Sequence, residues 1–187
     1  CLIVTKSSSS HPAALYQLRK ITRILALIIL LLVFVGFFLP TAYRVERSVF
    51  IGAPSDRVYS VMLSGDRLPE WMFIQGGHVV QSEGVLKQGD SVALQYNDVV
   101  EQGVLSFTDV SADLIRFDVR PKPKVNLVHN EIALQSSNGG TVVKWVIEGD
   151  LSAGLLSPYL ALFANDIAGA NFERSLQLLK EQVEHVR

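Results

Sequence analysis

From Gly77 onward the chain alternates between apolar and polar positions with a period of two, and this pattern predicts β-strands. We expect strands at residues 43–51, 78–82, 91–97, 100–110, 113–120, 125–136 and 141–150. Segments rich in Gly, Pro, Ser and Asn, such as Asn138-Gly139-Gly140, supply the turns between them. Because the connections are short, the strands are expected to be antiparallel neighbours in a meander.

One face of the expected sheet is apolar. The alternation assigns to it Val92, Leu94, Tyr96, Leu105, Phe107, Ile115, Phe117, Val119, Ile132, Leu134, Val143, Trp145 and Ile147. It assigns the opposite, solvated face to Arg116, Asp118, Lys144 and Glu148.

Helices are expected on either side of the strand series. Two short ones, 56–63 and 66–72, follow the first strand, and a long one covers 158–186. The long helix carries an apolar stripe of Phe172, Leu176, Leu179, Val183 and Val186, and a second stripe begins with Leu160, Phe163 and Ile167. Only the apolar face of the sheet is long enough to bury such a helix.

An uncharged apolar run at residues 24–39, preceded by Arg19, Lys20 and Arg23, predicts a transmembrane anchor at residues 21–43. A buried core helix and a cleaved signal peptide are the alternatives. The anchor leaves a flexible tail at 1–20 and a working domain at 44–187. Flanking positive charge then places the N-terminus in the cytoplasm and the domain on the outer, extracytoplasmic side of a single-pass membrane protein.

Composition narrows the classes of function. The chain has 187 residues and a net charge of −1, without a run of Lys and Arg, which argues against nucleic-acid binding. The part after the apolar run has the length of one ordinary domain. The only cysteine is Cys1, so cysteine usage does not indicate a redox compartment.

Motifs for catalysis or metal binding are lacking. The four histidines are scattered, with no metal-ligand spacing, and no cofactor is expected. His129 and Glu131 share a face of one strand, so they are weak candidates for a general acid/base pair. As ordinary polar residues on the solvated face of the sheet, they need no catalytic explanation. Alternation turns Asn130 inward, where it could anchor a ligand.

Four segments together resemble the SRPBCC superfamily (the START or helix-grip fold), in its polyketide cyclase/dehydrase and lipid-transport branch. They are the strand Val45–Pro54, the short helix end Pro69-Glu70-Trp71, the strand Gly140–Trp145, and the closing helix with Asn171–Leu176 and Leu179-Lys180. The resemblance covers everything from Arg44 on. Residues 72–77 depart from the aromatic-rich stretch of that family, which puts the shape of the cavity entrance in doubt.

The resemblance implies an α+β helix-grip fold: a curved seven-stranded antiparallel sheet wrapped around a long C-terminal helix, with two short helices after the first strand. It implies an apolar cavity between sheet and helix that binds a hydrophobic small molecule or lipid. The alternatives are a cyclase/dehydrase-type enzyme acting on an apolar or aromatic substrate, and an assembly factor with a vestigial cavity. Protein partners are not indicated.

The residues expected to line that cavity are large or inward-facing. They are Trp71, Tyr96, Phe107, Phe117, Asn130, Trp145, Leu160, Phe163 and Ile167. For each aromatic side chain, a place in the ordinary hydrophobic core is the competing interpretation.

Overall fold

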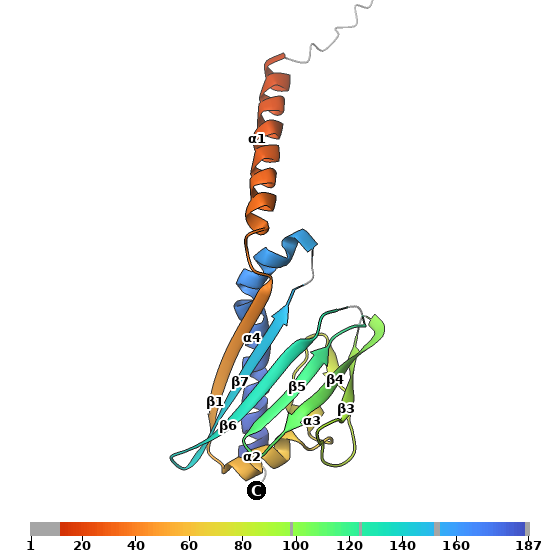
Figure 1. Cartoon of the computed structure of the whole chain (residues 1–187), viewed down its shortest axis with the longest axis vertical. Coiled ribbons are helices and arrows are strands. Elements are labelled where there is room, and N and C mark those ends of the chain that lie inside the picture. The colour runs from red at the N-terminus through yellow and green to blue at the C-terminus, as the bar shows by residue number, and fades with distance from the viewer. Residues whose placement is uncertain (1–11, 98, 124, 152–153, 186–187) are drawn as a thin grey trace, which may run out of the picture. The chain divides into compact units, whose positions relative to one another are not determined.

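The computed structural model describes residues 12–97, 99–123, 125–151 and 154–185. It divides into two compact units, Cys1–Leu39 and Pro40–Arg187. In the first unit the described structure is the helix α1 (Pro12–Gly36), and the second unit holds the sheet and the remaining helices (Figure 1).

The first unit gives no support to the prediction of a membrane span at residues 21–43. Within the part of the chain that the structure describes, no helix is both long enough and apolar enough to cross a membrane. Helix α1 begins at Pro12, inside the expected tail, includes the charged residues near residue 20, and ends at Gly36. Its uncharged part from Ile24 spans about 20 Å, against a hydrocarbon core of roughly 30 Å. The orientation and the extracytoplasmic location stay predictions.

The second unit is built on one sheet of seven antiparallel strands, as predicted. The spatial order is β1-β7-β6-β5-β4-β3-β2, so the first strand lies beside the last. The strands are β1 (Ala42–Ile51), β2 (Gly77–Val79), β3 (Ser91–Tyr96), β4 (Val99–Val110), β5 (Leu114–Arg120), β6 (Val128–Ser137) and β7 (Gly140–Asp150). From β7 back to β2 the order is a meander, because strands that are consecutive in the chain are neighbours in the sheet.

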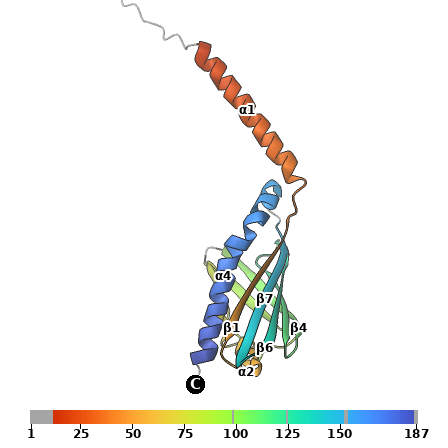
Figure 2. The same cartoon turned by 90° about the vertical axis from the view of Figure 1, so that its left-hand side faces the viewer.

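Helices cover the concave face of this sheet. Two short ones, α2 (Ser55–Met62) and α3 (Leu68–Trp71), follow β1, and the turn η1 (Gly154–Leu156) leads into the long helix α4 (Ser157–His185). Figure 2 shows α4 running along one side of the curved sheet. The expected helix-grip arrangement is therefore confirmed.

The core lies between the sheet and α4. The apolar face predicted from alternation is the buried one: eleven of its thirteen members are buried, while Tyr96 and Val119 are partly buried against the same core. On α4 the stripe is buried at Leu176, Leu179 and Val183, and Phe172 packs against the core. Val186, at the end of the predicted stripe, lies outside the described residues.

One inward-facing residue of β1 is charged. Arg47 donates from Nε to Glu173 Oε1 of α4 at 2.6 Å, and its guanidinium lies against Gly169, where a Cβ would collide with it. A glycine in mid-helix usually costs about 1 kcal/mol relative to alanine. Here it leaves room for an arginine between strand and helix.

Candidate ligand-binding cavity

A cavity of about 300 Å³ lies between the sheet and α4. Its wall draws on β1, β3 to β7, the segment after α3, and the middle of α4. The lining residues are Tyr43, Met72, Phe73, Ile74, Gln75, Leu94, Tyr96, Leu105, Phe117, Val119, Pro121, Val128, Asn130, Trp145, Asn171 and Phe172. The volume is at the lower end of the range for small-molecule sites.

The wall changes character from the inside outward. Leu94, Leu105 and Phe117 are almost fully buried, so the inner part of the lining is apolar. Towards the solvent the lining includes Gln75 and Asn171, which are joined by a hydrogen bond of 3.2 Å from Asn171 Nδ2 to Gln75 Oε1. The cavity therefore has an apolar floor and a polar rim, an arrangement typical of sites for apolar molecules.

The inner wall contains one polar side chain, Asn130, which is 5% exposed. Its Oδ1 accepts a hydrogen bond of 3.1 Å from Trp145 Nε1, and its Nδ2 donates one of 3.0 Å to the carbonyl oxygen of Val128. Because an indole nitrogen can only donate, the amide oxygen must face Trp145 and the NH₂ group must point the other way. Asn130 thus has a fixed orientation, and one of its two N–H bonds has no partner among the described residues.

Aromatic rings pack against one another in the same wall. The ring of Trp145 lies 6.0 Å from that of Phe117 and 5.1 Å from that of Phe172, both tilted. Such contacts hold side chains in defined positions, and aromatic rings have few rotatable bonds. The inner wall is consequently stiff.

Two tyrosines, Tyr43 and Tyr96, complete the wall, and the pKa of each phenol is raised above its ordinary value. For Tyr96 the cause is burial, which disfavours the phenolate. For Tyr43 burial is the larger cause, and the negative charge of Asp150 adds to it. Both phenols are therefore neutral at physiological pH.

Four of the nine residues expected to line the cavity do line it: Tyr96, Phe117, Asn130 and Trp145. Trp71 and Phe107 are buried next to it, with ring centroids 6.1 Å from Trp145 and 5.8 Å from Phe117, and belong to the core instead.

Leu160 and Phe163 are placed differently from the prediction. They are 40% and 57% exposed and lie outside the wall. The cause is the position of α4, whose first turns reach past the end of the sheet (Figure 2) and so have no strand opposite them. The side chain of Ile167 lies outside the described residues.

Other lining residues were not expected there. Four of them had a periodic signal in the sequence, because each belonged to a predicted apolar face or stripe: Leu94, Leu105, Val119 and Phe172. Val128 had such a signal too, as an apolar neighbour of Asn130 in the alternation of its strand. The segment from Met72 to Gln75, together with Tyr43, Pro121 and Asn171, had no periodic signal that would have indicated the cavity.

The sequence was compared with known protein families. Residues 42–184 match the profile of a family described as polyketide cyclase / dehydrase and lipid transport. The chain belongs to this family. A search of curated proteins found no match.

Solved structures show the same fold at low sequence identity. Protein CV1439 from Chromobacterium violaceum is 18% identical with a TM-score of 0.59, covering 75% of this chain and 96% of that one. Protein NE0264 from Nitrosomonas europaea is 12% identical with a TM-score of 0.60, covering 78% and 96%. DynU16, from the dynemicin biosynthetic locus, is 17% identical with a TM-score of 0.53, covering 76% and 47%.

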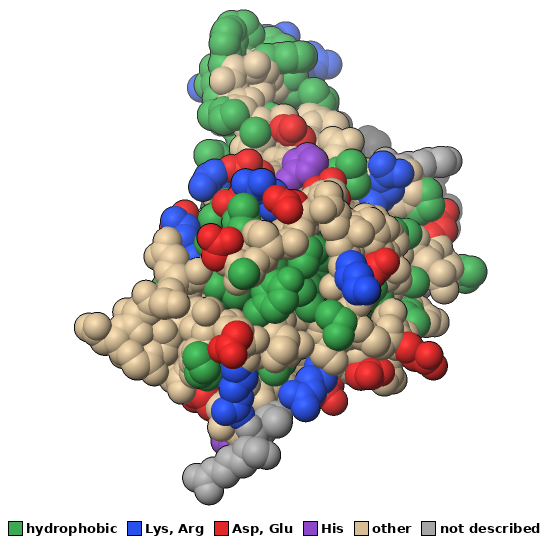
Figure 3. Space-filling model, turned by 60° about the horizontal axis from the view of Figure 1, so that its bottom comes forward, with side chains coloured by type: hydrophobic (Ala, Val, Ile, Leu, Met, Phe, Trp, Pro, Cys, Tyr) green, Lys and Arg blue, Asp and Glu red, His purple; other side chains and the backbone are tan. Residues whose placement is uncertain are grey.

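The candidate acid/base pair of this polyketide cyclase / dehydrase and lipid transport family member, His129 and Glu131, lies on the outer face of the sheet. His129 Nδ1 is 2.7 Å from Asp118 Oδ1, and Glu131 Oε2 accepts a hydrogen bond of 2.9 Å from Arg116 Nε. Figure 3 shows acidic, basic and histidine side chains side by side on the surface. The two residues share a face, as predicted, but it is the face opposite the cavity.

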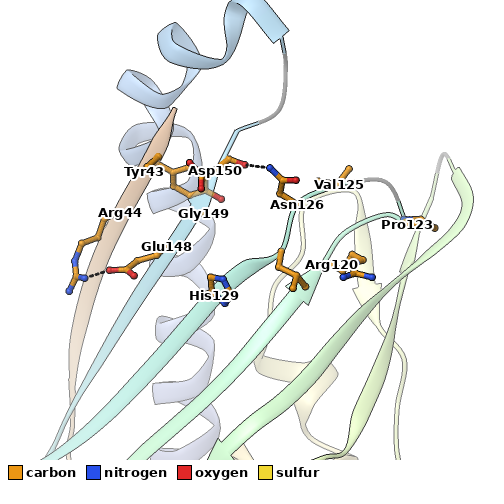
Figure 4. Close-up of a pocket in the computed structure, with 12 residues that line it drawn as sticks. Tyr43, Arg44, Arg120, Pro123, Val125, Asn126, His129, Glu148, Gly149 and Asp150 are labelled. Carbon is orange, nitrogen blue, oxygen red and sulfur yellow. Dashed lines mark hydrogen bonds and ion pairs between the residues drawn. The ribbon is translucent and has the colours of Figure 1, made fainter. Parts of the chain in front are cut away.

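A larger hollow of about 860 Å³ lies on the outer side, at the end of the sheet where β1 begins. Figure 4 shows the polar and charged side chains of this hollow. Arg44 pairs with Glu148, and Asn126 Nδ2 donates to the carbonyl oxygen of Asp150 at 3.4 Å. Arg44 and Glu148 are more than half exposed, so water screens them strongly. This open, solvated hollow is a weaker candidate than the inner cavity. Among the described residues no cluster of side chains suits a metal ion.

Proposed function

We propose that the domain binds a hydrophobic small molecule in the cavity between the sheet and α4. The observation that carries the proposal is the cavity itself: about 300 Å³ of space with a buried apolar interior and a polar rim. An apolar ligand that enters this hollow gains contacts with its apolar lining and is removed from water.

The membership of the chain in the polyketide cyclase / dehydrase and lipid transport family supports the proposal, because that family description names polyketides and lipids. The proposal concerns ligand binding. The candidate acid/base residues His129 and Glu131 lie outside the cavity, so they offer it no catalytic group. The proposal does not depend on helix α1.

Native mass spectrometry of the full chain, purified gently after expression, tests the proposal first. We expect a fraction of the protein to carry an additional small mass that organic solvent removes. A fluorescence titration with the neutral dye N-phenyl-1-naphthylamine is the second measurement. It tests binding even when the purified protein carries no ligand.

A pair of matched variants localises the binding. Val128 lines the cavity, whereas Val142 is on the outer face of β7. Val128→Phe fills the cavity and is expected to weaken dye binding about tenfold or more, while Val142→Phe is expected to leave it unchanged. Equal dye affinity in both variants, or no dye binding and no retained mass in the wild type, contradicts the proposal.

A further inference from the structure

The cavity wall is uncharged. None of its described lining residues is Lys, Arg, His, Asp or Glu, and its two tyrosines are kept neutral by burial. Two arginines lie near the wall without belonging to it. Arg47 is held by Glu173 against Gly169, and the exposed Arg174 lies over the ring of Phe73, with its guanidinium carbon 4.4 Å from the ring centroid. An ionised carboxylate or phosphate inside the cavity would lose its hydration without gaining a countercharge, which is strongly unfavourable. An anionic group such as the carboxylate of a fatty acid or the phosphate of a lipid headgroup is therefore a poor occupant of the cavity.

The cavity wall offers a hydrogen-bond donor at Asn130. The oxygen of Asn130 is engaged by Trp145, and one N–H by the carbonyl of Val128, so the second N–H remains. A buried donor without an acceptor costs about 1–3 kcal/mol. A neutral acceptor on the ligand, such as a carbonyl oxygen, removes that cost without introducing charge.

The shape of the inner wall favours a rigid ligand. The tilted rings of Phe117, Trp145 and Phe172 provide stiff flat surfaces close to Asn130. Rings in the ligand pack against such surfaces without losing much conformational freedom, whereas a flexible acyl chain has to be ordered on binding.

From these observations, and resting on the proposed function, we infer the chemical class of the ligand. The cavity selects a neutral, ring-containing molecule that has a carbonyl-type acceptor directed at the Asn130 amide, and it rejects carboxylates and phosphates. The selection comes from the uncharged wall and the single oriented amide.

Three probes of one ring skeleton test the inference on the full chain: fluorene, 9-fluorenone and fluorene-9-carboxylate, each titrated at pH 7.5 by quenching of tryptophan fluorescence. We expect 9-fluorenone to bind about fivefold more tightly than fluorene, as one neutral hydrogen bond provides. We expect the carboxylate to bind at least tenfold more weakly than fluorene. Equal affinities of ketone and hydrocarbon, or a carboxylate that binds as tightly as the ketone, overturns the inference.

Variants locate the donor. Asn130→Asp keeps an oxygen for Trp145 but removes the N–H, so the preference for 9-fluorenone over fluorene is expected to disappear. Asn138→Asp, the same change in the β6–β7 turn, is the matched control and is expected to keep the preference. If Asn130→Asp does not fold, the double variant Trp145→Phe/Asn130→Leu replaces it, because it removes donor and acceptor together and leaves neither unpaired. A preference that survives the loss of Asn130 overturns the inference.

The outcomes separate the inference from the proposed function. If fluorene binds in a way that Val128→Phe abolishes but the ketone has no advantage, the function stands and the ligand class is wrong. If no probe binds although native mass spectrometry shows a retained molecule, the ligand class is again wrong. If no probe binds and no molecule is retained, both are wrong.

Discussion

The indole nitrogen of Trp145 on β7 donates a hydrogen bond of 3.1 Å to the side-chain oxygen of Asn130 on β6. Both side chains are at least 95% buried. The bond satisfies a donor that would otherwise lie unpaired in the core, and it determines which way the amide faces. One strand pair thus positions both the aromatic wall and the polar group of the cavity.

The first prediction concerns the stability of this pair. Asn130→Leu leaves the indole N–H buried and unpaired, so we expect the free energy of unfolding to fall by about 1–3 kcal/mol. In a Trp145→Phe background the same change is expected to cost less, because no donor remains to be orphaned. Urea denaturation of the four proteins in this cycle measures the coupling. Equal costs of Asn130→Leu in the two backgrounds would show that the hydrogen bond contributes nothing.

The second prediction concerns Gly169 and Arg47. Gly→Ala inside a helix usually stabilises by about 1 kcal/mol. Gly169→Ala is expected to give little or none of this gain, because the new methyl group displaces the guanidinium of Arg47 from Glu173. In an Arg47→Met background the gain is expected to return. Thermal or urea unfolding measures it, and a full gain in the wild-type background would contradict the packing described.

The third prediction is a dependence of stability on alkaline pH. The pKa values of Tyr43 and Tyr96 are raised above 10.0 in the folded protein. Below pH 10 both phenols are neutral in either state. Above it the unfolded chain loses these protons first, so the free energy of unfolding falls as the pH rises from 10 towards the folded-state pKa values.

Urea midpoints measured from pH 8 to 11 check this dependence. The fall above pH 10 is expected to be shallower in Tyr43→Phe/Tyr96→Phe than in the wild type. Tyr16→Phe, on the exposed surface of α1, controls for the loss of a phenol. A double variant with the same alkaline profile as the wild type would show that neither phenol is responsible.

The fourth prediction concerns the outer face of the sheet. His129→Ala/Glu131→Ala removes two residues that pair with Asp118 and Arg116 away from the cavity. We expect binding of the neutral dye to stay within about twofold of wild type. The contribution of each exposed ion pair to stability is expected to stay below about 1 kcal/mol. A large loss of dye affinity in a protein that still folds would return these residues to the binding site.

Much of the fold could be predicted because its signals are local. Alternation along β5 and β7 identifies Phe117 and Trp145 as inward residues, since successive side chains of a strand point to opposite faces. The helical spacing of Leu176, Leu179 and Val183 identifies the buried side of α4 in the same way. Asn130 was identified as inward by alternation alone, between two apolar neighbours on β6.

The position of the cavity could not be predicted in the same way. Periodicity indicates that Leu160 and Phe163 share a helical face, but not that the helix extends past the sheet there. The cavity lies instead beside Asn171 and Phe172, where strands stand opposite α4. This depends on where the helix crosses the sheet and on how strongly the sheet curves, neither of which is a property of a short segment.

By itself the sequence determined which residues form strands and helices, which face of each is apolar, and, through four short resemblances, the family. The tertiary structure alone decided that the inward Asn130 faces Trp145, that Arg47 lies against Gly169, and which side chains enclose an uncharged space. The division has a physical reason. Burial patterns repeat within a few residues, whereas a cavity is the gap left when segments far apart in the chain, such as Tyr43 and Phe172, come together.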